Sequence, residues 1–372
     1  MAINFRLPGP TPLPPQVITA MQRPMISHRG VEFKMFYRSI LDRLKTVHRT
    51  DAEVLVWPAS GSAGWETAIV NLLSPGDAVL MVVTGDFGDR FRNVAGLFGL
   101  DVRSLGIPWG SAATPDQIRE ALLANPDVKA VFLTHNETST AVTNPLKESA
   151  AVIRDHGALV VVDAVSSAAG LPLFVDEWGI DFVMSGSQKA WMCPPGMMIA
   201  AIGPRAWDAY GKSTYHKFFW DLKSARTFAE QGMTPTTPPL TSLYALDAAL
   251  ELILEEGVER VWQRHAELGE RTRRGVEAMG LTLFADPAFA SNTVTAVSLP
   301  ENVSAKAMIA VMSERHDVVV QGGQGYLADR MIRIGHMGWV SASDIDGALI
   351  ALDDVATYFE IERALTADLR MA

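Results

Sequence analysis

The sequence predicts an α/β fold in which a mainly parallel sheet is flanked by helices and is followed by a smaller C-terminal α+β domain. From residue 54 onward, short and continuously apolar segments alternate with amphipathic stretches, which is typical of strands that are covered on both faces. The alternation stops in a proline-rich segment, residues 232–239, after which long amphipathic helices follow. Strand–helix alternation favours parallel strands, and such sheets bind ligands beyond the carboxyl ends of their strands.

Five apolar runs are the candidate strands of the main sheet. All of them are short, and hydrophobic residues follow one another in them without polar alternation, as buried strands require. They are Ala78–Val83, Lys129–Thr134, Ala158–Asp163, Phe182–Ser185 and Met197–Ile202.

Two helices between these strands carry clear boundary signals. Thr114–Gln117 offers an N-cap threonine, a proline at the first helical position and a glutamine three residues after the cap, which predicts a capping box. A second helix begins at Asn144 and Pro145 and ends at Gly157, just before the third strand.

Three parts of the chain can be distinguished. Residues 1–20 contain the proline-rich segment Leu7–Pro15, which predicts an extended arm because proline removes a donor and restricts φ. Residues 21–264 are the predicted large domain, and residues 265–372 are the predicted small domain. The later helices and strands are expected at Leu240–Glu256, Val258–Met279, Thr293–Leu299, Val318–Val320, Met331–Ile334 and Ser343–Phe359.

Composition excludes several classes of protein. Of the 372 residues, 48% are hydrophobic and 20% are charged, which excludes a disordered chain or a coiled coil. The net charge of −10 argues against a nucleic-acid partner. No apolar run reaches the roughly 18–20 residues that cross a membrane, and residues 1–6 lack the apolar core of a signal peptide. With a single cysteine, these features predict a cytoplasmic protein without a disulfide.

Two charged residues stand where charge is unexpected. Asp163 follows four apolar residues at the end of a predicted strand, where a buried carboxylate needs a partner. Lys189 lies just after the next predicted strand and before an apolar, proline-containing loop, which can lower the pKa of its amine. An amine and an acid on neighbouring strand ends suit a pyridoxal 5'-phosphate (PLP) site, although a capping aspartate and an ordinary lysine remain the alternative.

A candidate phosphate site precedes both residues. Residues 58–67 follow a strand and open a helix, and they carry small hydroxyl side chains around Ser60, Gly61 and Ser62. Amides at a helix N-terminus bind phosphate well. Simple N-capping by Ser60 or Ser62 is the alternative interpretation of this segment.

These segments, taken together with others in order along nearly the whole chain, resemble the class V aminotransferases of fold type I, which depend on PLP. Within that family the chain is most similar to the alanine–glyoxylate and serine–glyoxylate aminotransferases. The segments that carry the resemblance are Pro8–Pro15, Ser60–Ser62, Leu133–Thr140, Val162–Ser167, Ser185–Lys189, Thr234–Pro238, Ser291–Val297 and Ile332–Gly338.

The resemblance implies a role for each matching residue. Lys189 would form the Schiff base with PLP and transfer protons, Asp163 would keep the pyridine nitrogen protonated, and Arg333 would bind the substrate carboxylate through its guanidinium fork. The other implied cofactor contacts are Ser60, Gly61, Ser62 and Gln188 at the phosphate, Thr138 at the phenolic oxygen, Val165 under the ring, Phe87 stacked on the ring, and Thr236 at the phosphate from the other subunit.

The resemblance also implies a reaction and an assembly. We expect transamination of serine or alanine with a small 2-oxo acid, glyoxylate, in a homodimer that shares its active sites. A different donor such as aspartate, or a non-catalytic protein that binds a phosphorylated ligand on the same fold, are the alternatives. Met233 stands where one branch of the family has a phosphate-binding tyrosine, so that contact is expected to be lost or replaced.

The sequence favours neither a catalytic cysteine nor a metal site. Cys193 lies four residues after Lys189 and is the one cysteine that a desulfurase of this fold could use, but a buried apolar residue is the favoured interpretation. The sequence contains no cluster of histidines and cysteines with metal-ligand spacing, so no metal site is predicted.

Overall fold

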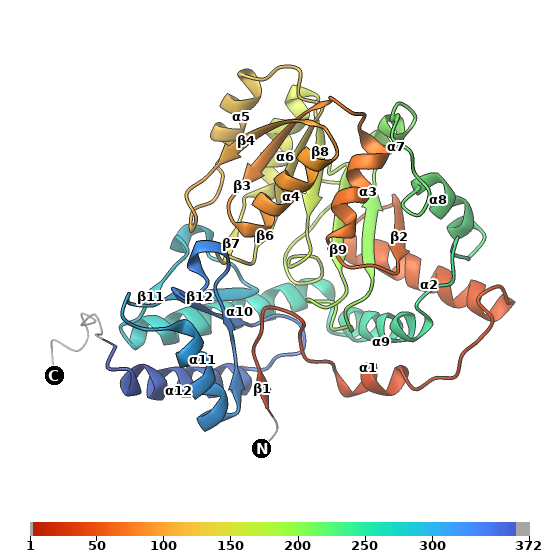
Figure 1. The fold of residues 1–372 in the computed structure, drawn as a ribbon. Coiled ribbons are helices and arrows are strands. Elements are labelled where there is room, and N and C mark those ends of the chain that lie inside the picture. The colour runs from red at the N-terminus through yellow and green to blue at the C-terminus, as the bar shows by residue number, and fades with distance from the viewer. Residues whose placement is uncertain (1–2, 362–372) are drawn as a thin grey trace.

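The computed structural model describes residues 3–361, and its main element is a seven-stranded sheet between two layers of helices (Figure 1). In spatial order its strands are β2 (Glu53–Trp57), β10 (Met198–Ile202), β9 (Phe182–Gly186), β8 (Leu159–Asp163), β5 (Ala130–Thr134), β3 (Ala78–Val83) and β4 (Asp101–Gly106). The strands from β9 to β4 pair in parallel, whereas β10 is antiparallel to both of its neighbours. The predicted mainly parallel sheet is therefore confirmed.

Helices cover both faces of this sheet, which explains why its central strands are apolar throughout. Along β3, Val79 and Met81 pack into one hydrophobic cluster and Leu80 and Val82 into the other, because successive side chains point to opposite faces. On the first face lie α3 (Ala63–Leu72), α4 (Asp86–Leu97), α7 (Pro204–Tyr210) and α8 (Leu222–Glu230). On the second face lie α2 (Val31–His48), α5 (Pro115–Leu123), α6 (Leu146–His156) and α9 (Leu240–Glu256).

The predicted capping box of the first helix and the predicted end of the second are both confirmed. The Thr114 hydroxyl accepts from the amide of Gln117 at 3.2 Å, and the Gln117 side chain accepts from the amide of Thr114 at 2.9 Å, which completes the capping box of α5. Gly157 ends α6 in the left-handed conformation, with φ of 94°.

A second, four-stranded antiparallel sheet follows in the C-terminal part of the chain (Figure 1). Its strands are β11 (Thr282–Leu283), β12 (Val294–Ser298), β15 (Met331–Gly335) and β14 (Gln321–Gly322). The helices of this part are α10 (Val258–Ala278), α11 (Ala305–His316) and α12 (Ala342–Tyr358), with 3₁₀ turns η1 (Pro287–Phe289) and η2 (Gly325–Leu327). The predicted domain boundary after residue 264 falls inside α10, and the division into domains stays a prediction.

The N-terminal segment joins the two parts of the molecule. Strand β1 (Asn4–Phe5) pairs with β13 (Val318–Val319), and the short helix α1 (Pro15–Ala20) lies beside α9 (Figure 1). Between them the chain is extended, as its prolines predict. The amide of Gly335 donates to the carbonyl of Arg6 at 2.7 Å, and the amide of Thr11 donates to that of Gln188 at 3.1 Å. The arm therefore contacts both sheets near Lys189.

Several short elements were not among the predicted ones. They include β4, which is half-exposed at the sheet edge, and a two-strand hairpin of β6 (Asn136–Glu137) and β7 (Val142–Thr143). Within residues 3–361, no helix has both the length and the apolar character that crossing a membrane would need.

Candidate active site

A cavity of about 190 Å³ lies beyond the carboxyl ends of β5, β8 and β9. This is the edge of a parallel sheet at which ligands bind. Nine of the eleven site residues predicted from the sequence line it, whereas Thr236 and Arg333 do not. The lining residues are Ser60, Gly61, Ser62, Trp65, Phe87, Thr134, Asn136, Thr138, Asp163, Val165, Ser166, Gln188 and Lys189.

Lys189 is buried against the N-terminal arm. Its amine donates a hydrogen bond to the carbonyl of Pro8 at 2.5 Å, and its carbonyl accepts from the Thr11 hydroxyl at 2.9 Å. Gly9 has a φ of 121°, which favours glycine, and a Cβ added there would lie 2.4 Å from the Lys189 amine in its present position. Burial and, to a smaller extent, the positive charge of Arg333 lower the pKa of Lys189 to about 8, against the opposing effect of Asp163. A much larger fraction of this amine is therefore neutral near physiological pH than in an ordinary lysine.

Asp163 faces the same cavity from the end of β8. One carboxylate oxygen accepts from the amide of Val165 at 2.9 Å, and the other accepts from the indole Nε1 of Trp65 at 2.8 Å. Burial nevertheless raises the pKa of Asp163, against the lowering effect of these two donors and of Lys189. A protonated ring nitrogen placed against this carboxylate would lower its pKa again, because opposite charges stabilise each other.

Trp65 is a site residue that the sequence analysis missed. It lies in the first part of α3, and its ring also stacks on Phe91 with centroids 5.1 Å apart. A buried tryptophan almost always finds an acceptor for its N–H. That tendency, together with the position of Trp65 just after the phosphate-binding candidate, is the signal that could have identified it.

The segment from Ser60 to Ser62 leads directly into α3. Ser62 is the N-cap residue, but its side chain makes no capping hydrogen bond, so the hydroxyl remains available to a ligand in the cavity. A Cβ on Gly61 would lie 2.6 Å from a methyl carbon of Val165, which explains the glycine. A helix N-terminus that faces a cavity with two serines is suited to a phosphate group.

Polar atoms without protein partners also point to a bound group. The Gln188 Oε1 atom and the Thr134 hydroxyl are buried and have no hydrogen-bond partner among the residues that the structure describes. Both residues line the cavity. Since buried polar atoms are nearly always satisfied, these two fit a site that a polar ligand completes.

Thr138 belongs to a hydrogen-bond network at one side of the cavity. Its hydroxyl donates to that of Ser166 at 2.7 Å, and the Asn136 amide also donates to Ser166 at 2.9 Å. Asn136 donates in addition to the hydroxyl of Thr293 at 3.0 Å, which links the cavity to β12. Asn136 and Ser166 were not predicted as site residues, because their contacts depend on the β6–β7 hairpin.

Arg333 lies on β15 and contacts the backbone of Thr138. Its Nε donates to the carbonyl of Gly322 at 2.8 Å, and its Nη1 donates to the carbonyl of Thr138 at 3.0 Å and to the side chain of Gln324 at 3.1 Å. Burial lowers its pKa to about 10, while Glu137 and Asp86 oppose this shift. Two of the three guanidinium nitrogens are thus already engaged, and a carboxylate held by both ends of the fork would have to displace Gln324.

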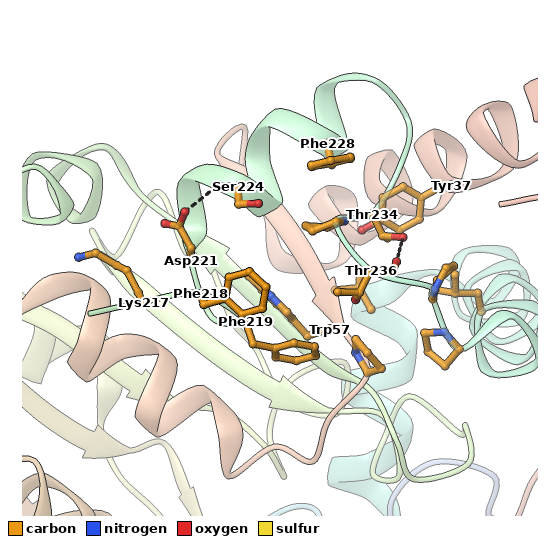
Figure 2. Close-up of a pocket in the computed structure, with 16 residues that line it drawn as sticks. Tyr37, Trp57, Lys217, Phe218, Phe219, Asp221, Ser224, Phe228, Thr234 and Thr236 are labelled. Atoms are coloured by element: carbon orange, nitrogen blue, oxygen red, sulfur yellow. Dashed lines mark hydrogen bonds between the residues drawn. The ribbon is translucent and has the colours of Figure 1, made fainter. Parts of the chain in front are cut away.

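Thr236 lies away from this cavity in the same chain. It is exposed and lines a second cavity, of about 300 Å³, together with Tyr37, Trp57 and Phe219 (Figure 2). Its carbonyl accepts from the Thr234 hydroxyl at 2.7 Å. The expectation that Thr236 reaches the phosphate of the other subunit stays a prediction.

Cys193 is fully buried, as the favoured interpretation expected. Its thiol donates to the carbonyl of Trp191 at 3.2 Å, and burial raises its pKa, which disfavours the reactive thiolate. Two histidines of the motifs are buried as well: burial lowers the pKa of His135 to about 4 and that of His336 to about 3. None of the three lines the cavity.

Comparison with known proteins agrees with this geometry. The family model described as aminotransferase class-V matches residues 3–345. The L-aspartate–glyoxylate aminotransferase of Paracoccus denitrificans is 37% identical over 94% of this chain and 89% of that protein. The serine–glyoxylate aminotransferase of Methylorubrum extorquens is 37% identical over 92% of this chain and 88% of that protein.

One more sequence relative and one solved structure are also similar to this chain. A protein named soluble hydrogenase, small subunit, from Synechococcus is 40% identical over 94% of this chain and 91% of that protein. The crystal structure of alanine–glyoxylate aminotransferase from Nostoc superposes with a TM-score of 0.91 at 32% identity, covering 95% of both chains. The family match, the fold and the cavity together establish that this chain belongs to the class V aminotransferases.

Proposed function

We propose that this enzyme transfers the amino group of a small amino acid, serine or alanine, to glyoxylate, and that it uses PLP. The observation that carries the proposal is the presence of the Lys189 amine, the Asp163 carboxylate and a helix N-terminus in one cavity. Three of the compared proteins are named for glyoxylate as the acceptor, whereas the donors in their names differ. The donor is therefore the part of the proposal that most needs measurement.

The residues present fit PLP. Ser60–Ser62 and Gln188 would hold the phosphate, Asp163 the ring nitrogen and Thr138 the phenolic oxygen, with Val165 and Phe87 against the ring. When bound, the cofactor supplies an electron sink for the bonds at the substrate α-carbon. The buried Asp163 favours a protonated ring nitrogen, which makes that sink stronger.

Lys189 is placed to move the proton. Its lowered pKa leaves the amine partly neutral near pH 8, so Nζ can accept the proton of the substrate α-carbon and release it again. Its burial under the arm limits the access of water to that proton. One residue thus acts as both general base and general acid.

Arg333 would hold the substrate carboxylate. Arg333 is 3% exposed, and its Nη2 has no hydrogen-bond partner among the described residues. An arginine–carboxylate contact in a buried site is both strong and directional. This contact would orient the α-carbon of a donor toward Lys189, whose pKa responds to the charge of Arg333.

We also propose a homodimer with shared active sites, in the cytoplasm. Thr236 is exposed beside a second cavity that is rich in aromatic side chains, and Phe218 in its lining is 90% exposed. Its neighbour Phe219 is also exposed, and a contiguous exposed apolar patch is typical of a protein interface. Sedimentation analysis should give twice the mass of the chain, and an active monomer would contradict the homodimer.

Covalent attachment of the cofactor tests the central residue. The holoenzyme is reduced with borohydride, digested and mapped by mass spectrometry, and the modification is expected at Lys189. A purified protein that is yellow, and whose visible band shifts with serine or alanine, would exclude the non-catalytic alternative. Modification of a different lysine, or a colourless protein that stays colourless with added PLP, would contradict the proposal.

A matrix of donors and acceptors tests the substrates. We expect serine or alanine with glyoxylate to give a kcat/KM at least about tenfold above that of aspartate, a difference of about 1.4 kcal/mol in transition-state stabilisation. Ping-pong kinetics are expected because one site serves both half-reactions. A preference for aspartate would show that the alternative donor is correct.

A further inference from the structure

The helix that carries Phe87 begins without a capping side chain of its own. Gly85 occupies the N-cap position of α4, and it has no side chain to accept hydrogen bonds from the amides of the first turn. Those amides belong to Asp86, Phe87 and Gly88, and such groups need partners when they are buried. The partners come from a remote segment of the chain.

That segment is Glu137–Ser139, at and after strand β6. The Ser139 hydroxyl accepts from the amide of Asp86 at 2.9 Å, and the Glu137 carboxylate accepts from the amides of Gly88 at 3.1 Å and Phe87 at 3.4 Å. Glu137 also accepts from the amide and the hydroxyl of Ser139, at 3.1 and 2.5 Å. Two side chains that are about fifty positions away in sequence thus cap the whole first turn of α4.

The fit between the two segments is tight. A Cβ added to Gly85 would lie 2.4 Å from Cγ of Glu137 and 2.5 Å from the hydroxyl oxygen of Ser139. Glu137 is completely buried, and no lysine or arginine among the described residues forms an ion pair with it. A buried carboxylate is costly unless several donors serve it, and a helix N-terminus is a favourable place for its negative charge.

The segment Glu137–Ser139 also connects the cavity to Arg333. Between Glu137 and Ser139 lies Thr138, whose side chain lines the cavity and whose carbonyl accepts from Arg333. Glu137 itself interacts electrostatically with Arg333, opposing the effect of burial on that guanidinium. The cap of α4 therefore joins Phe87, Thr138 and Arg333, three residues that arise from separate parts of the sequence.

We propose that Glu137 is a positioning residue of the active site, whose carboxylate fixes the first turn of α4 against the Thr138 segment and so sets the place of the Phe87 ring relative to Arg333. This inference rests on the proposed function, because Phe87 matters only if a ring is bound against it. Glu137 itself does not line the cavity. Its effect on the cofactor is exerted through Phe87 and Thr138.

The test compares Glu137→Gln with Glu148→Gln, a matched control at an exposed glutamate in the first turn of α6. Glutamine keeps the shape of Glu137 but carries no charge. Its NH2 group cannot accept the hydrogen bond that the second carboxylate oxygen accepts. In the apo-protein, hydrogen exchange of the peptide that contains Phe87 and Gly88 should become at least about tenfold faster in Glu137→Gln, because the cap weakens. Exchange of that peptide should not change in the control.

The holoenzyme gives the second readout. Glu137→Gln should raise the dissociation constant of PLP about tenfold and change the circular dichroism of its visible band, since the ring loses its fixed neighbour. With Phe87→Ala already present, the same substitution should have little further effect on PLP binding, because both act through one contact. Fully additive effects, or unchanged exchange at α4, would overturn the proposal.

The positioning role of Glu137 and the proposed function can fail independently of each other. If Glu137→Gln does not fold, Ser139→Ala removes the hydroxyl that is shared by Asp86 and Glu137, and it should give the same pattern in weaker form. If borohydride labels no lysine, the proposed function fails, yet the exchange of the apo-protein still reports whether Glu137 caps α4. Fast exchange at α4 without any change in PLP binding would refute the positioning role alone.

Discussion

Two opposite charges in one small cavity determine the chemistry at the scale of single residues. Lys189 and Asp163 end neighbouring segments of the sheet, and each shifts the pKa of the other. In both residues burial is the largest cause of the pKa shift, and it disfavours the charged form. The Lys189 amine therefore loses its proton more readily than an ordinary lysine, and the Asp163 carboxylate would be stabilised by a nearby cation. The protonated ring nitrogen of a bound cofactor would be such a cation.

The pKa of Lys189 predicts how cofactor incorporation depends on pH. Only the neutral amine adds to an aldehyde, and a pKa of about 8 makes roughly one tenth of it neutral at pH 7, against well under one thousandth for an ordinary lysine. The rate at which apo-protein incorporates PLP should therefore rise with pH, reach half of its maximum near pH 8 and level off above about pH 9. A rate that continues to rise to pH 10 in stopped-flow absorbance measurements would contradict the lowered pKa.

Removing the indole donor to Asp163 should cost stability. In Trp65→Phe, one buried carboxylate oxygen loses its only side-chain donor, and such a loss costs about 1–3 kcal/mol in the free energy of unfolding. Trp207→Phe is the matched control, because its indole donates to Glu53 at a half-buried site. Urea unfolding of the two apo-proteins measures the difference, and equal losses in both would show that Trp65 is not special.

At the scale of helices and strands, the apolar runs of the main sheet could be predicted because burial on both faces leaves no room for polar residues. Strand β4 was not predicted because it lies at the sheet edge and carries the polar residues Asp101, Arg103 and Ser104, so it is not a continuous apolar run. The hairpin β6–β7 was not predicted because both residues of β6 are polar yet buried, and only tertiary contacts satisfy them. Asn136 and Ser166 were missed for the same reason.

A substitution in the turn before α3 tests whether this turn binds the phosphate. Gly61→Ala places a Cβ 2.6 Å from Val165 in the wall of the cavity, so we expect PLP binding to weaken at least about tenfold while the fold is retained. Gly96→Ala is the control, since no atom lies within 4 Å of a Cβ at that helical position. Equilibrium dialysis measures both constants, and unchanged binding in Gly61→Ala would argue against a phosphate at this turn.

At the scale of the whole molecule, the N-terminal arm shows that the site is assembled from distant parts of the chain. The arm crosses from β13 to Lys189, and this crossing could not be derived from its prolines alone, which predict only extension. The extended arm itself was predicted and is observed. The three-part division of the chain and the homodimer remain predictions.

Mixing of inactive partners tests the shared site. If Thr236 serves the other subunit, Lys189→Ala and Thr236→Ala chains that are exchanged at equal amounts should form mixed dimers, each with one intact site. Activity should then reach about a quarter of the wild-type value, since half of the dimers are mixed and each has one intact site of two. Activity that never exceeds the average of the two separate variants would show that Thr236 acts in its own chain or not at all.

A crystal structure of the protein with PLP tests the central claim most directly. We predict that the cofactor is joined to Nζ of Lys189 while the Asp163 carboxylate lies within hydrogen-bond distance of the ring nitrogen, about 2.7–2.9 Å away. A ring bound outside the cavity, or one whose nitrogen faces any group other than Asp163, would contradict the account.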